Sequence, residues 1–423
     1  MTKLAMEGGR PARTKPLPPN YPGATVYGAE EAQGAAEVIH AQSPFRYYGP
    51  NVKNEVRTFE EEMARHLNVP YVLGVTSCTA ALVVALKALG IGYGDKVIVP
   101  AITFLATPGA VVCANAVPVF VDADDSMNLD PADLERVMDK DVKAIIAVSI
   151  LGNPCDMDPI LAFAKKHNLY VIEDVAQSCG ASYKGKVTGT MGDIGVYSFQ
   201  MNKILTAGEG GALVTSNPEL FDRAVRYHDQ GMFRDKARYG IESADEEKAF
   251  IGQNYRMSEI TGAVLNEQWK KLGGIVSSMQ TRCRELQAKL TAELPDMKFR
   301  RLADPEGDIG SNLGMILPST AFTQAFIKAM AAENIGAYTL YGSRPVYMLP
   351  QLFHQRTAEK DNFPFNYPFE NPVVYTEDMC PQAVDYIART VYVPISPLLT
   401  EQDVEEIAEG IVKVYRHIAQ VQV

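Results

Sequence analysis

Positive charge is scarce in this sequence, and so are long apolar runs. The 423 residues include 40 lysines and arginines against 51 aspartates and glutamates, which gives a net charge of −11. Because nucleic acids and anionic membranes bind basic surfaces, this balance argues against both as partners. No uninterrupted apolar run approaches the roughly 20 residues of a membrane span, and the N-terminal segment lacks the apolar stretch of a signal peptide. The sequence therefore predicts a cytoplasmic protein.

Cysteine and histidine are also few and scattered. The six cysteines form no CxxC pair and no framework typical of disulfides. The six histidines show no HxxxH spacing of the kind that zinc sites use. We expect reduced, mostly buried thiols and no bound metal.

Strand-like and helix-like patterns alternate through the first part of the chain. Several short apolar runs are hydrophobic on both faces, as in a parallel sheet covered by helices. The expected strands are Tyr71–Val75, Lys96–Val99, Val117–Val121, Ala144–Ile150, Tyr170–Ile172, Ile194–Phe199 and Gly211–Thr215. Helical patterns between them cover Thr79–Leu89, Phe104–Ala114, Pro131–Met138 and Pro159–His167. Repeated βαβ units of this kind predict an α/β fold.

The sequence predicts three parts. Residues 1–25, rich in proline, glycine and charge, are expected to form an extended N-terminal arm. A large domain is expected over residues 26–272 and a small C-terminal domain over 273–423, joined by a long helix that begins at Ser258. The stretch Tyr341–Cys380 has little periodicity and predicts a long loop region. Loops of that length in compact domains are usually functional.

Two segments carry the most chemistry. Asp174 follows a buried apolar run, and ligands in open α/β sheets bind beyond the carboxyl ends of strands. A carboxylate there can hold a protonated ring nitrogen, although an N-cap is the alternative role. Lys203 follows the strand Ile194–Phe199 and precedes Gly-Glu-Gly-Gly, which lets the backbone pass close to a ligand. Such a lysine can form an imine with pyridoxal 5'-phosphate, whereas a lone loop lysine is ordinarily solvated.

Residues after other strands suggest a phosphate and a ring contact. Ser77, Cys78 and Thr79 lie in a turn that leads into an alanine-rich helix. The unpaired amides and dipole at a helix start favour phosphate, although Ser77 or Thr79 as an ordinary N-cap is the alternative. Ser198 is placed to donate its hydroxyl to the same phosphate. Phe104 either stacks on a planar ring or belongs to the core.

These motifs resemble the DegT/DnrJ/StrS aminotransferases, a fold-type I family that uses pyridoxal 5'-phosphate. Ser77–Leu82 is similar to the family's SGTAAL, and Gly94–Pro100 to its GDEVIVP. Glu173–Gln177 is similar to EDAAQ, and Asn254–Glu259 to NYRMSE. Cys78 stands where the family usually has glycine. The resemblance implies a large, mostly parallel sheet domain flanked by helices and a smaller C-terminal α+β domain.

The resemblance also implies roles for single residues. Lys203 binds the cofactor covalently and moves protons, and Asp174 holds the pyridine nitrogen. The other implied cofactor contacts are Gln177 near the phenolic oxygen, Cys78, Thr79 and Ser198 at the phosphate, and Phe104 on the ring. Asn254 reaches the cofactor phosphate of the neighbouring subunit, which implies a homodimer with shared active sites.

Substrate contacts are less defined by the sequence. Arg256 either binds a substrate anion or forms a structural ion pair. In the long loop region, Tyr341, Arg344 and His354 either face a sugar acceptor or only pack within the loop.

The implied reaction is a ping-pong transfer to a keto or aldehyde sugar. The amino donor is usually L-glutamate in this family and L-glutamine in some members. The segments SFQxxKxxTAGEGG and MEGGRPAR resemble a less typical branch of the family, and this resemblance implies 8-oxo-3,8-dideoxy-manno-octulosonate, a lipopolysaccharide-sugar precursor, as the leading acceptor. Nucleotide-linked keto-hexoses and scyllo-inosose are alternatives. Related sugar dehydratases have histidine at the position of Lys203, which argues against that activity, and a non-catalytic regulatory protein that binds the cofactor is the alternative of another class.

Overall fold

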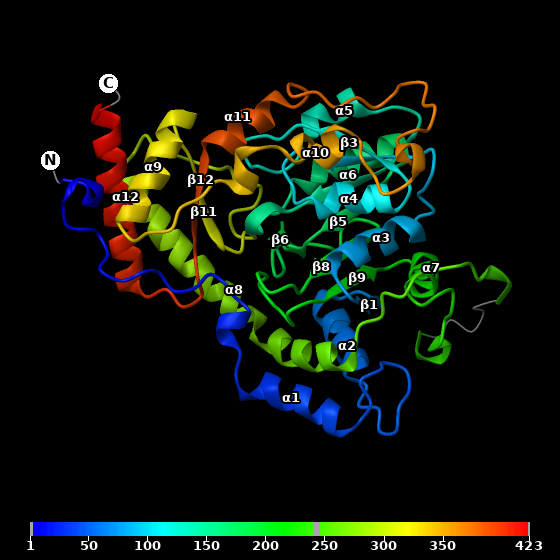
Figure 1. Ribbon diagram of the computed structural model, residues 1–423. Coiled ribbons are helices and arrows are strands. Elements are labelled where there is room, and N and C mark those ends of the chain that lie inside the picture. Colours follow the sequence, from blue (N-terminus) through cyan, green and yellow to red (C-terminus); the bar gives the residue numbers. More distant parts are fainter. Residues whose placement is uncertain (1–2, 240–245, 422–423) are drawn as a thin grey trace.

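A seven-stranded sheet forms the centre of the larger lobe in the computed structural model, which describes residues 3–239 and 246–421 (Figure 1). Its order is β1-β9-β8-β5-β4-β2-β3, and every strand except β9 runs in the same direction. The strands are β1 (Tyr71–Val75), β2 (Lys96–Pro100), β3 (Val117–Val121), β4 (Val142–Val148), β5 (Tyr170–Asp174), β8 (Ile194–Ser198) and β9 (Gly211–Thr215).

Helices cover both faces of this sheet, which explains why its strands are apolar on both sides. On β4, Ile146 belongs to the core beneath α3, α4 and α7, whereas Ile145 belongs to the opposite core beneath α6. A third core joins α2 and α8 to the β1–β9–β8 end of the sheet. The helices of this lobe are α1 (Ala29–His40), α2 (Glu55–Leu67), α3 (Cys78–Ala88), α4 (Ala106–Cys113), α5 (Leu134–Val137), α6 (Met157–His167) and α7 (Pro218–His228).

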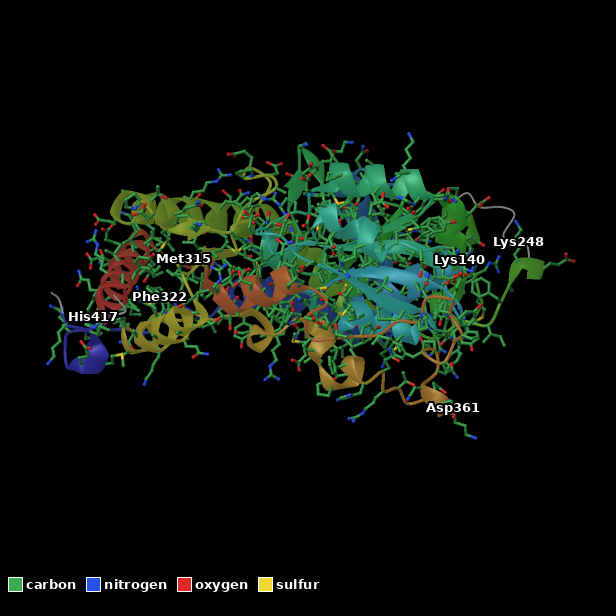
Figure 2. The ribbon with its side chains drawn as sticks, turned by 90° about the horizontal axis from the view of Figure 1, so that it is seen from above. Lys140, Lys248, Met315, Phe322, Asp361 and His417 are labelled. Atoms are coloured by element: carbon green, nitrogen blue, oxygen red, sulfur yellow. The ribbon has the colours of Figure 1, made fainter. Side chains whose placement is uncertain are left out.

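The smaller lobe contains an antiparallel three-stranded sheet of order β10-β11-β12. The long helix α8 connects the lobes, because it packs on α1 and α2 near one end and on α12 near the other (Figure 1). Figure 2 shows the elongated molecule, with Met315 and Phe322 towards one end and Lys140 towards the other. The elements are α8 (Glu259–Glu293), β10 (Lys298–Phe299), β11 (Asn312–Ile316), α9 (Thr320–Ala332), α11 (Pro381–Arg389), β12 (Thr390–Pro394) and α12 (Glu401–Val421).

Short elements complete the chain. The predicted long loop region is not without structure, since it contains η7, η8, α10 and η9 and packs partly on the large core. The short elements are η1 (Ala5–Glu7), η2 (Ala24–Val26), η3 (Pro131–Asp133), η4 (Ile150–Gly152), β6 (Ser182–Tyr183), β7 (Lys186–Val187), η5 (Lys236–Tyr239), η6 (Glu246–Lys248), η7 (Leu340–Ser343), η8 (Val346–Met348), α10 (Pro350–Phe353) and η9 (Lys360–Asn362).

The predicted fold class is confirmed: a large, mostly parallel sheet flanked by helices is followed by a smaller α+β lobe. β1, β3 and β9 have the predicted bounds, whereas β4 begins two residues before Ala144 and ends at Val148. The division at residues 25 and 272 stays a prediction. None of the helices in residues 3–239 and 246–421 is long and apolar enough to cross a membrane.

The N-terminal arm is tied to the smaller lobe. The buried carboxylate of Glu333, at the end of α9, accepts hydrogen bonds from the amides of Ala5 (2.9 Å) and Ala12 (2.7 Å). Arg13 forms ion pairs of 2.8 Å with both Asp403 and Glu406 on α12. The arm therefore follows α12 before it crosses to α1 (Figure 1).

Candidate active site

A cavity of about 690 Å³ lies where the carboxyl ends of four strands meet the smaller lobe. β1, β2, β5 and β8 run in the same direction, so the residues that follow them gather at one edge of the sheet. The lining from this edge includes Ser77, Cys78, Thr79, Thr103, Phe104, Thr107, Asp174, Gln177, Ser198 and Lys203. Eight of the predicted site residues therefore line one cavity. Seven of them come from this edge of the sheet, and the eighth is Tyr341 from η7.

The start of α3 forms one wall of the cavity. Ser77 is the N-cap, and its hydroxyl accepts a hydrogen bond from the amide of Ala80 at 3.1 Å. The N-cap alternative is therefore correct for Ser77, but a capped helix still presents first-turn amides without helical partners. Gly211, the last residue of the Gly-Glu-Gly-Gly segment, must be glycine, because a Cβ there would lie 2.6 Å from the amide nitrogen of Cys78. These features leave a helix start suited to an anion.

Asp174 ends β5 and is only 4% exposed. Its carboxylate accepts hydrogen bonds from the amide of Ala176 (3.1 Å) and the hydroxyl of Thr107 (3.0 Å). Burial raises the pKa of Asp174, and these hydrogen bonds oppose that effect. The next element along the chain is β6, not a helix, so Asp174 is not an N-cap. Within the described chain it has no ion-pair partner, so the cavity holds a carboxylate able to receive a cation.

Lys203 is half-buried in the turn that follows β8. Burial lowers the pKa of its amine, while Cys78 and Asp174 oppose that effect. Gly208 has φ of 82°, and its carbonyl accepts a hydrogen bond from the amide of Met201 at 3.0 Å. The glycine therefore closes the turn that contains Lys203. Lys203 is thus not a freely solvated loop lysine, which was the alternative that the sequence left open.

Gln177 and Tyr341 lie together in the cavity. The Gln177 side-chain amide donates to the Tyr341 hydroxyl at 2.9 Å and accepts from the amide of Leu151 at 3.2 Å. Leu151 has a left-handed backbone (φ 46°, ψ 47°), a conformation that favours glycine and is retained here beside the cavity. The carboxamide of Gln177 is therefore fixed in orientation on both sides.

Phe104 is 59% exposed, so it is not a core residue. Its ring lines the cavity at 6.4 Å from the ring of Tyr341. Ser198, by contrast, is buried at the end of β8 and also lines the cavity. The individual cofactor roles of both residues stay predictions.

The N-terminal arm supplies a wall that the sequence did not indicate. Asn20, Tyr21 and Pro22 line the cavity, and the amide of Gly23 donates to the carbonyl of Lys203 at 3.2 Å. A Cβ on Gly23 would lie 2.9 Å from the backbone nitrogen of Thr206, so the arm approaches the turn after Lys203 too closely for another residue. The composition of the arm predicted an extended segment but carried no signal for this contact.

The smaller lobe supplies the opposite wall with Ser311, Asn312 and Tyr338. The Tyr338 hydroxyl donates to the side-chain oxygen of Asn312 at 2.8 Å. Neither residue belongs to a motif that sequence reasoning singled out. Thr103 and Thr107 were also missed; they stand four residues apart after β2, with Thr107 in the first turn of α4 and Thr103 before that helix begins.

Four predicted residues lie outside this cavity. Asn254 is exposed and forms an isolated bridge with Asp229. Arg256 pairs with the buried carboxylate of Asp229 at 2.5 Å, which favours the structural ion pair over a substrate role. Arg344 and His354 are exposed, and their substrate roles stay predictions.

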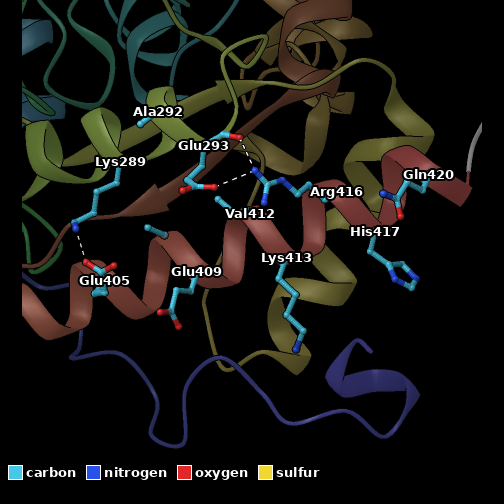
Figure 3. Close-up of a pocket in the computed structure, with 11 residues that line it drawn as sticks. Lys289, Ala292, Glu293, Glu405, Glu409, Val412, Lys413, Arg416, His417 and Gln420 are labelled. Atoms are coloured by element: carbon cyan, nitrogen blue, oxygen red, sulfur yellow. Dashed lines mark hydrogen bonds and ion pairs between the residues drawn. The ribbon is translucent and has the colours of Figure 1, made fainter. Parts of the chain in front are cut away.

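A second cavity of about 590 Å³ lies between α8 and α12 (Figure 3). Two ion pairs join the helices here: Lys289 with Glu405, and Arg416 with Glu293 at 2.9 Å. No group of three or more histidine, cysteine, aspartate or glutamate side chains in the described ranges is arranged to hold a metal. The predicted catalytic residues Lys203 and Asp174 line the first cavity.

Comparison with known proteins identifies similar sequences. Residues 28–412 match the family described as DegT/DnrJ/EryC1/StrS aminotransferase family. A GDP-perosamine synthase of Escherichia coli O157:H7 is 39% identical over 225 residues, which span 53% of this chain and only 60% of that protein. An L-glutamine:2-deoxy-scyllo-inosose aminotransferase of Streptoalloteichus tenebrarius is 30% identical over 98% of both chains.

Solved structures give the same result for the fold. The crystal structure of an aminotransferase from Psychrobacter cryohalolentis superposes with a TM-score of 0.81 at 28% identity, covering 96% of this chain and 100% of that one. The similarity in fold therefore extends over both lobes.

Proposed function

Because the chain belongs to the DegT/DnrJ/EryC1/StrS aminotransferase family, we propose that it transfers an amino group from an amino acid to a keto or aldehyde sugar. Pyridoxal 5'-phosphate is the cofactor of this family. One observation carries the proposal: the amine of Lys203 and the buried carboxylate of Asp174 line the same cavity, beside the start of α3.

The cavity fits this cofactor in three respects. Asp174 is a buried carboxylate without an ion-pair partner in the described residues, which suits a protonated ring nitrogen. The first turn of α3, with Cys78 and Thr79, suits a phosphate. Phe104 offers an exposed ring to the cavity, which suits stacking on a flat heterocycle.

The cofactor, when bound, supplies an electron sink for the carbanion that forms when the donor loses its Cα proton. We assign the transfer of this proton to Lys203, whose half-buried amine lines the cavity and has a pKa lowered by burial. Asp174 keeps the ring nitrogen positive by remaining ionised. Gln177, held by Leu151 and Tyr341, positions the phenolic side of the ring.

L-Glutamate is the proposed amino donor, with L-glutamine as the second candidate because one relative is named for it. The first acceptor to test is 8-oxo-3,8-dideoxy-manno-octulosonate, as the sequence pattern suggests. The names of two relatives favour a GDP-linked keto-hexose and a keto-inositol as further candidates. The amide and hydroxyl groups of Asn20, Asn312 and Tyr338 in the lining support an acceptor rich in hydroxyl groups.

The test of this function is a half-reaction with L-glutamate. We expect the absorbance of the lysine-bound cofactor, at roughly 400–430 nm, to bleach as the amino group is transferred. The resulting amino form is then mixed with each candidate acceptor, and recovery of the band identifies the substrate. An unchanged spectrum with both L-glutamate and L-glutamine would favour the non-catalytic regulatory protein instead.

The protein is further proposed to be a homodimer whose active sites are shared through Asn254. Exposed apolar side chains suit an interface in this part of the chain: Ile251, three residues before Asn254, is 93% exposed, and Tyr48 is 66% exposed. The Tyr48 ring packs at 4.5 Å on Phe45, which in turn lies beneath Arg256. Sedimentation is expected to give twice the chain mass, and a monomer with full activity would contradict the shared site. A cytoplasmic location is proposed with this function.

A further inference from the structure

The carboxylate of Asp174 is held by donors from three separate segments. Oδ1 accepts from the amide of Ala176 at 3.1 Å and lies 4.0 Å from the thiol sulfur of Cys78. Oδ2 accepts from the hydroxyl of Thr107 at 3.0 Å. Thr107 is thus the only hydroxyl in the described residues that hydrogen-bonds this carboxylate.

The direction of the hydrogen bonds around Thr107 is fixed by proton count. A hydroxyl has one proton to donate, and an ionised carboxylate only accepts. Thr107 therefore donates to Asp174, and the hydroxyl of Thr103, at 2.9 Å, must donate to Thr107. Both threonines are 1% exposed, so water does not replace this chain.

We propose that Thr107, supported by Thr103, is a positioning residue that keeps Asp174 ionised and aimed at the cofactor ring nitrogen. This inference rests on the proposed function. In a buried chain of hydrogen bonds each donor polarises the next, so Thr103 strengthens the bond that Thr107 makes.

The reason such help matters is the burial of Asp174. Burial raises the pKa of its carboxyl, and the Thr107 hydrogen bond is one of the interactions that lower it again. The other titratable groups that interact with the carboxylate are Lys203, Cys78, Cys155 and Tyr341. Of these only the Lys203 amine can be cationic, and in the holoenzyme that amine is bound to the cofactor. A neutral Asp174 would have no charge with which to hold a protonated ring.

The test replaces Thr107 by valine, which keeps the shape and removes the hydroxyl. The holoenzyme is prepared with cofactor labelled with nitrogen-15 in the ring, and the ring-nitrogen NMR shift is measured. We expect the wild type to give a pyridinium-like shift and Thr107→Val to move towards neutral pyridine. Turnover should fall roughly ten- to hundredfold, with little change in KM, since a hydrogen bond to a charged group is lost.

Three further variants separate positioning from general structure. Thr107→Ser restores the hydroxyl and should restore the pyridinium shift. Thr103→Val should move the shift in the same direction by a smaller amount, and it carries the test if Thr107→Val does not fold. Thr323→Val removes another buried hydroxyl, which bonds the Arg389 carbonyl in the smaller lobe, and should leave the shift unchanged.

The outcomes also distinguish this inference from the proposed function. A wild-type protein that binds no cofactor or transfers no amino group would remove the function itself. A wild type that is active, with Thr107→Val or Thr103→Val retaining the full pyridinium shift, would overturn only the role of the threonines.

Discussion

Lys203→Ala is expected to abolish amino-group transfer while the protein stays folded. Without the amine there is neither a covalent attachment nor a group to carry the Cα proton, so turnover should fall by a factor on the order of 10⁶, as when a covalent catalyst is removed. The side chain is half-buried and its free amine has a pKa lowered by burial, so its removal should not lower the melting temperature of the cofactor-free protein.

The attachment itself can be measured separately from activity. Borohydride reduction of the holoenzyme followed by peptide mass analysis should place a pyridoxyl group on the peptide that contains Lys203. The Lys203→Ala protein should give none. Lys143→Ala, which removes an exposed lysine at β4, should behave as the wild type in both assays. Normal turnover in the Lys203 variant would contradict the central assignment.

Asp174→Asn is expected to give the second largest loss. The amide keeps the size of the side chain but has no charge to stabilise a protonated ring nitrogen. Loss of one preorganised electrostatic contact typically lowers turnover by about 10²–10³, and we expect that fall with a much smaller loss of bound cofactor. An equal loss of activity and cofactor would mean that Asp174 mainly holds structure.

The cofactor-free protein provides an independent check through pH. Burial raises the pKa of Asp174 in the folded state, so the folded protein binds this proton more tightly than the unfolded chain does. Ionised Asp174 therefore lowers stability as the pH rises past its unfolded pKa, near 3.9. The cofactor-free Asp174→Asn protein should melt at the same or a higher temperature than the wild type at pH 7. A lower melting temperature would contradict this account.

Much of the site could be predicted because it lies at strand ends. Asp174 and Lys203 each follow an apolar run, and the parallel sheet brings the ends of such runs to one edge. Site residues in the long loop region were harder to predict. Of Tyr341, Arg344 and His354, only Tyr341 lines the cavity, because a segment without periodicity does not indicate which side chains point inwards.

Contacts between distant segments were beyond sequence reasoning. Thr107 and Asp174 are 67 residues apart, and their hydrogen bond forms only because the start of α4 lies near the carboxyl end of β5. The arm residue Tyr21 and the smaller-lobe residue Asn312 meet at the cavity only after both lobes have formed. Asn254 is different, since its predicted contact requires a second subunit.

The hydrogen bond between Gly23 and Lys203 connects the least regular part of the chain to its most reactive one. Residues 20–22 line the cavity, and we expect substitutions there to reshape the proposed acceptor wall. Gly23 itself cannot drift in the same way, because any added atom there would press on the turn that carries the amine. Residues 20–22 are therefore suitable positions for engineering the proposed substrate preference, whereas Gly23 should be kept.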